Sequence, residues 1–358
     1  MLVQVLQPIP LAFLGIIAIY TIVLVVLLKK ILKNKAVEFA SSPATNKPSD
    51  TADSSFEDKA DEAMRLNQTF RKFVPKQFVD HFAKHGSDTL ELGRADEDEL
   101  AILFSDIRGF TGLSENMTPQ ELMNFLNSYF LRMNDPIHQN SGFIDKFIGD
   151  AVMALFDRPA GTNTDKAQDA IRAALGLREA IIRYNEHRAN CDYPAVNIGI
   201  GVHFGPVIIG TVGSEDRMDT TVIGDAVNIA FRLEALAPKY FTDIVVSAET
   251  LKQANADGVF KYRLLDWVRV KGRQTPLEIY EVIDHQADEV KQLKLANAEF
   301  IKLGITYRKL QQWDQAQQSF QRAIEISPSD TLAKHHLFQC DVLMNSDLPK
   351  DWDGSILL

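Results

Sequence analysis

Two apolar segments, residues 100–107 and 143–156, each place one aspartate where a buried strand is expected to end. Asp106 follows the letters AILFS, and Asp150 follows KFIG. A carboxylate at the end of a buried strand is costly unless it has a partner. If one sheet brings the two aspartates together, their oxygens would form a site for a hard cation such as Mg²⁺ or Mn²⁺. Taken singly, either aspartate could equally cap a helix or a turn.

The segment RGFTG, residues 108–112, follows Asp106 and leads into an expected helix. Its glycines and threonine suit a tight turn. Backbone N–H groups at such a turn and helix start can meet phosphate oxygens. The stretch therefore combines a candidate cation site with a candidate phosphate-binding turn.

The first 30 residues predict a membrane anchor. Residues 11–28 contain no charged side chain over 18 positions, which meets the minimum length for spanning a bilayer. Lysines follow at positions 29, 30, 33 and 35, whereas residues 1–20 contain neither lysine nor arginine. The positive-inside rule then places the rest of the chain in the cytoplasm, as a single-pass protein of the inner (plasma) membrane. A cleaved signal peptide is less favoured, because its positive charge would precede the apolar stretch.

Two short regions are expected between the anchor and the main domain. Residues 31–67 are rich in Ser, Pro, Asp and Thr, which predicts a disordered cytoplasmic linker. Residues 68–96 place aromatic side chains at roughly helical spacing on both sides of Pro75, which predicts a short helical segment that joins linker to domain.

Length and composition limit the number of domains and the classes of function that the chain can have. The 358 residues leave room for about two domains. The net charge of −10 argues against nucleic-acid binding, which usually shows a basic footprint. The two cysteines, Cys191 and Cys340, are far apart and suggest neither a disulfide framework nor a zinc site.

Residues 97–284 form the main predicted domain. Helices are expected over residues 119–139, 165–186 and 225–235. Strands are expected over residues 100–107, 195–204, 218–223, 244–247, 262–270 and 277–282, with a hairpin over 142–156 and a turn followed by a strand in GPVIIGTVG. The order βαββαβ with extra strands predicts an α+β fold, with a ferredoxin-like sheet and helices on one face.

Five stretches of this domain, in chain order, resemble the motifs of class III nucleotide cyclases, in the bacterial branch of adenylate cyclases. They are FSDIRGFTGLSE, KFIGDAVMALF, IGIGVHFGPVIIGTVG, TTVIGDAVNIAFRLE and VKG. The resemblance covers residues 97–284. It implies a head-to-tail homodimer that converts a nucleoside triphosphate into a 3′,5′-cyclic monophosphate and pyrophosphate. Such an enzyme is a phosphorus–oxygen lyase.

The resemblance assigns the metal and phosphate contacts. Asp106, Asp150 and the carbonyl of Ile107 would hold two divalent ions, Mg²⁺ or Mn²⁺, per site. Two such ions can lower the pKa of the attacking 3′-hydroxyl and stabilise the leaving oxygens. The triphosphate would be bound by Gly109, Phe110, Thr111 and Lys271.

The resemblance also assigns two catalytic side chains to one helix. Arg232 matches the arginine that stabilises the negative charge of the transition state. Asn228 matches the residue that orients the ribose, and its i−4 position places it on the same helix face as Arg232. Without the resemblance, these two would be an ordinary polar helix face.

Base selection falls to Lys146 and Thr221. The Lys146 ammonium donates, which suits the adenine N1 acceptor, whereas guanine has a donor there. Guanylate cyclases carry a glutamate at the position of Lys146, so the lysine favours ATP. The Thr221 hydroxyl can accept from the adenine amino group but can also donate to the guanine oxygen, so its selectivity is weaker. Asp219 would replace Thr221 only if the strand register slipped.

In this family each active site takes residues from two chains. The metal aspartates Asp106 and Asp150 would come from one subunit, and the base-reading and transition-state residues from its partner. A monomer would then have no complete site. A shared membrane would favour pairing by raising the local concentration.

The C-terminal region has its own pattern. Residues 297–330 fit one tetratricopeptide unit, in which Gly304 and Ala316 are the small residues where two helices approach closely. We therefore predict a helical segment over 285–346, with a third helix over 331–344. One such unit needs a neighbour to cover its apolar face, which would be the cyclase domain, the other subunit or another protein partner. Residues 347–358 are predicted to be a tail that docks through Trp352.

Three functions stay open at this stage. The favoured one is a membrane-anchored adenylate cyclase. A guanylate cyclase is disfavoured by Lys146 and left open by Thr221. A catalytically silent scaffold or nucleotide sensor is disfavoured because Asp106, Asp150 and Arg232 are all present. A diguanylate cyclase would need a GGDEF-type signature, which the sequence lacks.

Overall fold

The computed structural model describes residues 61–66, 69, 73, 75–84, 92–93, 95–214, 216–270 and 275–357. The predicted anchor, most of the predicted linker and Lys271 lie outside these residues. The chain divides into two compact units, Met1–Thr69 and Phe70–Leu358, and every labelled element belongs to the second. None of the helices in the described ranges is long and apolar enough to cross a membrane.

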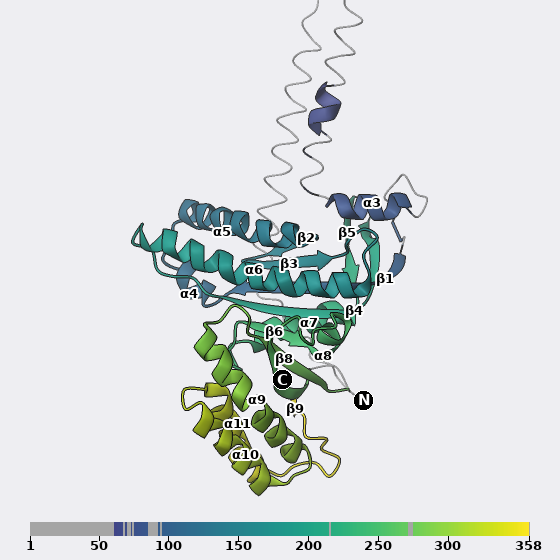
Figure 1. Cartoon of the computed structure of the whole chain (residues 1–358). Coiled ribbons are helices and arrows are strands. Elements are labelled where there is room, and N and C mark those ends of the chain that lie inside the picture. The colour runs from purple at the N-terminus through teal and green to yellow at the C-terminus, as the bar shows by residue number, and fades with distance from the viewer. Residues whose placement is uncertain are drawn as a thin grey trace, which may run out of the picture. The chain divides into compact units, whose positions relative to one another are not determined.

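The second unit is built on one mixed sheet with helices around it (Figure 1). The strand order is β2-β3-β1-β4-β6-β8-β7-β9, and β5 pairs with β4 beside this path. The strands are β1 (Ala95–Ile107), β2 (Gly142–Ile148), β3 (Ala151–Phe156), β4 (Ile198–Ser214), β5 (Arg217–Ile223), β6 (Ile244–Ser247), β7 (Tyr262–Arg269), β8 (Leu277–Val282) and β9 (Ile356–Leu357). The helices are α3 (Lys76–Lys84), α4 (Phe110–Ser114), α5 (Pro119–Gln139), α6 (Asn163–Ala189), α7 (Asp225–Leu236), α8 (Ala248–Gln253), α9 (Asp288–Lys309), α10 (Trp313–Ile326) and α11 (Thr331–Met344).

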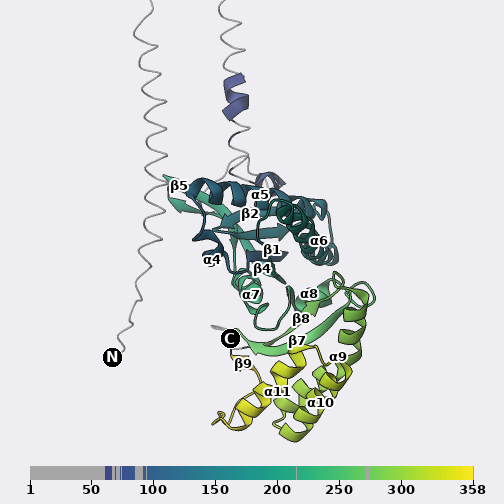
Figure 2. The same ribbon diagram turned by 90° about the vertical axis from the view of Figure 1, so that its left-hand side faces the viewer.

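Helices cover both faces of the sheet, so the prediction of helices on one face is wrong. Alternate β1 residues separate the two cores: Ala101 and Leu103 pack with α5 and α6, whereas Ile102 and Phe104 pack toward α3 and α7. Figure 2 shows α5 and α6 on one side of the strands and α7 on the other. This alternation is the period-2 pattern of a strand that is buried on both faces.

Strand β4 is continuous over 17 residues, which corrects the predicted turn in GPVIIGTVG. One side of β4 pairs with β1 along its length, with Pro206 opposite Glu99. On the other side, β6 pairs with residues 200–202 and β5 with residues 208–214. Pro206 lies in the gap between these two partners, where its missing N–H interrupts no ladder.

Helix α7 lies directly on β4 because β4 presents glycines to it. A Cβ atom on Gly201 would lie 2.2 Å from the backbone nitrogen of Glu234 and 2.5 Å from the carbonyl oxygen of Ala230. The alternating glycines of the IGIG sequence therefore allow a close helix–strand contact that a side chain would prevent.

Helix α5 begins at the predicted residue 119, and α6 begins at Asn163, two residues before the predicted start. A capping box precedes each helix. Thr118 accepts a hydrogen bond from the backbone of Glu121, whose carboxylate accepts from the Thr118 N–H at 2.8 Å. Thr162 and Asp165 make the same reciprocal arrangement before α6. Such capping boxes satisfy N–H groups that have no partner inside the helix.

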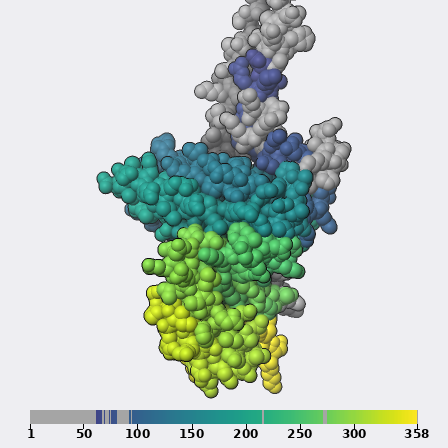
Figure 3. All heavy atoms as spheres, viewed as in Figure 1, coloured from purple at the N-terminus to yellow at the C-terminus, as the bar shows by residue number. Residues whose placement is uncertain are grey.

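The C-terminal helices pack against the chain's own sheet, at the β7–β8 end (Figure 3). Ile301, Ile305 and Phe320 share one buried cluster with Leu265 and Ile279. A Cβ atom on Gly304 would lie 2.4 Å from the Phe320 ring, so the predicted close approach of α9 and α10 is confirmed. The predicted third helix is also confirmed, as α11. Membership of the tetratricopeptide family stays a prediction.

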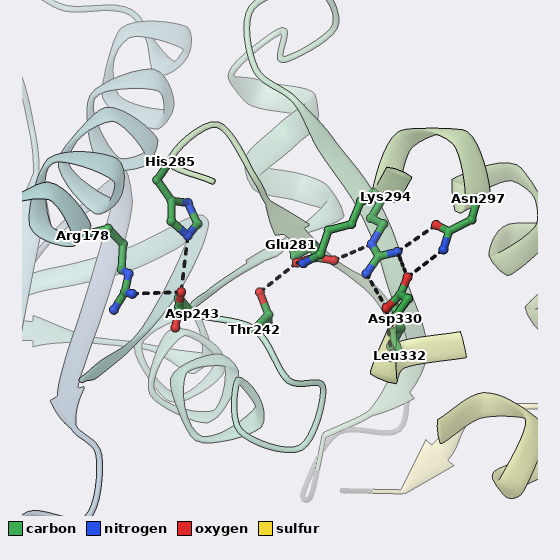
Figure 4. A network of polar contacts seen from close by, with 10 residues as sticks. Arg178, Thr242, Asp243, Glu281, His285, Lys294, Asn297, Asp330 and Leu332 are labelled. Atoms are coloured by element: carbon green, nitrogen blue, oxygen red, sulfur yellow. Dashed lines mark hydrogen bonds and ion pairs between the residues drawn. The ribbon is translucent and has the colours of Figure 1, made fainter. Parts of the chain in front are cut away.

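Buried polar contacts join this segment to the sheet (Figure 4). Lys294 Nζ lies 2.7 Å from Glu281 Oε2, and Asn297 Nδ2 donates to Asp330 at 2.7 Å. Arg263 forms ion pairs with both Glu281 and Asp330. Charges buried in this way are tolerated only when each is paired, so the segment is an integral part of the second unit.

The C-terminal tail docks as predicted. The Trp352 ring stacks on Trp313 at a centroid distance of 6.0 Å, and Arg269 pairs with Asp353 at 2.6 Å. Ile356 then pairs in parallel with Val268, which adds β9 to the edge of the sheet.

Candidate active site

The two aspartates predicted as metal ligands meet at the ends of neighbouring strands. Asp106 is the second-last residue of β1, and Asp150 lies in the turn between β2 and β3. Oδ2 of Asp150 accepts a hydrogen bond from the backbone N–H of Ile107 at 3.3 Å. Burial, and then the adjacent Asp106, raise the pKa of the Asp150 carboxyl to about 7.

This pair has the chemistry of a cation site. Two carboxylates that face each other in a partly buried place repel, and a cation removes that repulsion. Within the described residues there is no cluster of three or more His, Cys, Asp and Glu side chains. Two carboxylates with a backbone carbonyl are the kind of hard-oxygen set that suits Mg²⁺ or Mn²⁺.

The turn after Asp106 has the geometry that its sequence predicts. Gly109 has φ +68° and precedes the short helix α4. A side chain at this φ would be strained, so the position favours glycine. No heavy atom lies within 4 Å of the place where a Gly109 Cβ would be, and Thr111 is exposed. The backbone here is open to a ligand.

Asn228 and Arg232 project from α7, one helical turn apart. Asn228 is exposed and Arg232 is half-buried. Within the part of the chain that the structure describes, Arg232 has no ion pair, and the neutral amide of Asn228 is exposed. Both side chains are therefore available to a ligand or to a second chain.

Lys146 and Thr221 come together, although β2 and β5 are not neighbours in the strand order. Both approach the carboxylate of Asp145. Thr221 Oγ1 donates to Asp145 Oδ2 at 3.0 Å, and Lys146 Nζ lies 3.7 Å from the same oxygen. Lys146 Nζ also lies 3.0 Å from Asp219 Oδ2. The sheet therefore brings the two base-reading candidates into one group of polar side chains.

Sequence reasoning missed Asp145. Its contact with Thr221 spans 76 residues, so no local periodicity reports it. The register shift between Ile144 and Lys146 makes Asp145 the extra residue of a β-bulge. The only sequence signal is an acidic residue next to the lysine, in a stretch otherwise apolar on both sides.

A sequence family described as Adenylate and Guanylate cyclase catalytic domain matches residues 93–284, which is more than half of the chain. This chain belongs to that family. The predicted cyclase domain, residues 97–284, lies within the matched range.

Named relatives agree with this membership. The cyclase chain is 42% identical over 219 residues to an adenylate cyclase of Anabaena cylindrica, covering 60% of this chain and 42% of the relative. It is 34% identical over 276 residues to the terminal-differentiation-specific adenylate cyclase of Dictyostelium discoideum. This match covers 77% of this chain and 13% of the relative. The chain thus spans less than half the length of either relative.

A solved structure matches a larger share of this chain than residues 93–284 make up. It is a bacterial light-regulated adenylyl cyclase, with 28% sequence identity and a TM-score of 0.57. The match covers 69% of this chain and 71% of that one.

Proposed function

We propose that this chain is an adenylate cyclase, which converts ATP into 3′,5′-cyclic AMP and pyrophosphate at sites shared by two copies of the chain. The observation that carries the proposal is the convergence of Lys146 and Thr221 in a member of the cyclase family. An ammonium donor beside a hydroxyl suits the adenine edge, which offers an acceptor at N1 and a donor at the 6-amino group.

In the reaction, the 3′-oxygen of the ribose forms a bond to the α-phosphorus as the bond to the bridging oxygen of pyrophosphate breaks. The 3′-hydroxyl gives its proton to solvent water, and pyrophosphate leaves with the electron pair of the broken P–O bond. Asn228 orients the ribose for in-line attack, and Arg232 stabilises the charge that develops on the α-phosphoryl oxygens. Gly109, Phe110, Thr111 and Lys271 are proposed to bind the triphosphate.

Asp106, Asp150 and the Ile107 carbonyl are the groups that would hold two divalent ions, Mg²⁺ or Mn²⁺. When bound, these ions would supply a lowered pKa for the 3′-hydroxyl and charge neutralisation for the leaving group. The fit rests on the placement of the groups, since the Ile107 N–H donates to Asp150 Oδ2 at 3.3 Å and so brings Asp150 to the end of the strand that carries Asp106. Burial, and then Asp106, raise the pKa of Asp150, so a nearby cation would stabilise its ionised form.

The homodimer is supported by exposed apolar side chains on the elements that carry the base-reading and catalytic residues. Phe147 and Ile148 are exposed on the β2–β3 hairpin, Met218 and Ile223 on β5, and Phe231 on α7. Exposed apolar side chains that gather on one set of elements mark an interaction surface more often than scattered ones do. A second copy of the chain, head to tail, is the proposed occupant.

The first test measures cyclic product from the protein without residues 1–60. ATP and GTP are offered separately with Mg²⁺ or Mn²⁺. We expect cyclic AMP from ATP, lost in Asp150→Ala. Cyclic GMP as the main product would favour the guanylate cyclase alternative. The absence of any product from a verified dimer would favour a silent scaffold or sensor.

The shared site has its own test. Asp106→Ala and Arg232→Ala proteins should each be inactive, because each lacks one half of every site. Their mixture should recover part of the activity, since a heterodimer contains one intact site. If heterodimers form and no activity returns, the sites are not shared between chains.

The proposed location is the inner (plasma) membrane, with residues 1–30 as a single-pass anchor and the cyclase domain in the cytoplasm. The support is the uncharged stretch 11–28 with the lysines that follow it. Membrane fractionation of the full chain and of the chain without residues 1–35 tests this. Equal amounts of both in the soluble fraction would exclude the anchor.

A further inference from the structure

Asp145 is held in an unusual position for a carboxylate. Ile144 pairs with Ala154 and Lys146 pairs with Met153, so Asp145 is the residue that the β-bulge adds to β2. Its side chain is 1% exposed, whereas that of Lys146 beside it is 31% exposed. A bulge turns consecutive side chains toward the same side of a strand. Asp145 can therefore lie beneath Lys146 instead of on the opposite face.

The carboxylate binds the hydroxyl hydrogen of Thr221. Thr221 Oγ1 donates to Asp145 Oδ2 at 3.0 Å, and Asp145 Oδ1 is buried with no hydrogen-bond partner in the described ranges. Burial raises the pKa of Asp145 to about 6, so at pH 8 this carboxylate is ionised, accepts hydrogen bonds and donates none. Thr221 therefore has to be the donor in this contact, and such charge-assisted hydrogen bonds are stronger than neutral ones.

A threonine hydroxyl has one hydrogen and two lone pairs. With its hydrogen bound to Asp145, Thr221 can only accept a further hydrogen bond. The adenine 6-amino group is a donor, so it fits this oxygen. The guanine 6-oxo group is an acceptor, so it would face lone pairs and lose its hydrogen bond with water.

Lys146 is fixed in the complementary role. Its ammonium lies 3.0 Å from Asp219 Oδ2 and 3.7 Å from Asp145 Oδ2, so two carboxylates hold it. It keeps a donor for the acceptor N1 of adenine, whereas guanine has an N–H at that atom. Thr221 is then the acceptor for the adenine 6-amino group, and Lys146 is the donor to adenine N1. Guanine has the opposite hydrogen-bonding group at each of these two positions.

We propose that Asp145 is the specificity-determining positioning residue of the base pocket, because it fixes Thr221 as a hydrogen-bond acceptor and thereby excludes guanine. This inference rests on the proposed function of Lys146 and Thr221 as base-reading residues. It removes the ambiguity of a threonine, whose free hydroxyl could serve either purine.

The test measures binding, so that it does not depend on turnover. The probes are 3′-deoxy-ATP and 3′-deoxy-GTP, which lack the attacking hydroxyl, and the measured quantity is the ratio of their Kd values. In Asp145→Asn, the new amide can donate to Thr221 and turn its hydrogen toward the base. We expect the preference for the adenine probe to fall about tenfold, which is the change in Kd ratio that the loss of one hydrogen bond produces.

The matched control removes the hydroxyl. Thr221→Val should also lower the preference for the adenine probe. When Asp145→Asn is added to Thr221→Val, the ratio of the two Kd values should change by less than about twofold, because the hydroxyl hydrogen that Asp145 orients is no longer present. Thr221→Ser, which keeps the hydroxyl, should retain the wild-type preference. Asp145→Ala serves as a second variant, and a thermal melt and a dimer measurement accompany each protein.

Two results would overturn the inference. One is an Asp145→Asn protein, folded and dimeric, whose preference stays within twofold of wild type. The other is an effect of Asp145→Asn that persists at full size in the Thr221→Val background. Wild-type conversion of ATP to cyclic AMP is measured separately, so a failure of the proposed function is told apart from a failure of this inference.

Discussion

Nη1 of Arg108 lies 3.3 Å from Oε1 of Glu234, although the two residues belong to different parts of the fold. Arg108 directly follows β1, which carries Asp106, and Glu234 lies on α7, two residues after Arg232. Glu234 is buried, and this burial raises its pKa to about 7 against the opposing effect of Arg108. The ion pair thus connects the end of β1, next to Asp106, with helix α7, which carries Asn228 and Arg232, within one chain.

Breaking this ion pair on one side should be costly. We expect Arg108→Met to lower the free energy of unfolding by about 1–2 kcal/mol at pH 8, because the buried Glu234 loses its partner and takes up a proton instead of staying ionised. The double variant Arg108→Met/Glu234→Leu should cost less than the sum of the two single changes, since it leaves no unpaired charge. Urea unfolding of the four proteins at pH 8 measures both quantities. Strictly additive costs would show that the pair is not coupled.

A methyl group at Gly201 should push α7 away from β4. The added Cβ would lie 2.2 Å from a backbone nitrogen of the helix, so Gly201→Ala should cost about 1–3 kcal/mol of stability. Turnover should fall further than stability explains, because Asn228 and Arg232 move with the helix. The control is Gly112→Ala, where no heavy atom lies within 4 Å and stability should change by less than about 1 kcal/mol. Equal effects at both glycines would refute the close-contact explanation.

His336 should make the fold sensitive to acid. Its side chain is fully buried, Nε2 lies 2.7 Å from the carbonyl oxygen of Leu265, and burial lowers its pKa to about 4. In the unfolded chain the value is about 6.5, so between pH 6.5 and 4 only the unfolded chain binds this proton. Stability from this residue is complete above about pH 6.5 and is lost as pH falls toward 4, by roughly 3 kcal/mol at most.

The variant His336→Gln isolates that contribution. It removes the titrating group but keeps an N–H for the Leu265 carbonyl, so the loss of stability between pH 7 and pH 4.5 should become smaller than in wild type. The exposed His138 on α5 supplies the control, since His138→Gln should leave the pH dependence unchanged. Chemical unfolding at several pH values gives the comparison. An unchanged slope in His336→Gln would rule out a neutral buried imidazole.

Removal of the C-terminal helices should expose a sheet face that cannot face water. A chain that ends at residue 287 would uncover Leu265, Val268 and Ile279. It would also deprive the buried Arg263 of Asp330 and the buried Asp266 of Arg308. We expect this truncated protein to aggregate and to bind a hydrophobic dye, whereas removal of residues 1–60 alone should give a soluble dimer. Size-exclusion chromatography and dye fluorescence report the outcome. A monodisperse truncated protein would show that the helical segment is dispensable for folding.

Much of the fold could be predicted from the sequence. Helix α5, strands β6 and β8 and helix α11 have the predicted bounds, because amphipathic periodicity and capping residues mark their ends locally. The convergence of Asp106 with Asp150, and of Lys146 with Thr221, followed from matching motifs in order. Asp106 lies near the end of β1 and Asp150 in a turn, whereas Lys146 and Thr221 lie within β2 and β5.

The features that could not be predicted from the sequence depend on contacts between residues far apart in the chain. The predicted turn in GPVIIGTVG is part of β4, because Pro206 lies where β4 has a partner on one side only. The apolar positions of α7 show that one face is buried but not against which side of the sheet. Asp145 stayed hidden because a bulge and a contact 76 residues away decide what its side chain touches.

Strand β4 connects two parts of the proposed site, since it pairs with β1, which carries Asp106, and with β5, which carries Thr221. This one uninterrupted strand spans the distance between Asp106, a proposed metal ligand, and Thr221, a proposed base-reading residue. In a head-to-tail dimer these two residues would belong to opposite active sites. A rotation of one subunit against the other would then change both sites together.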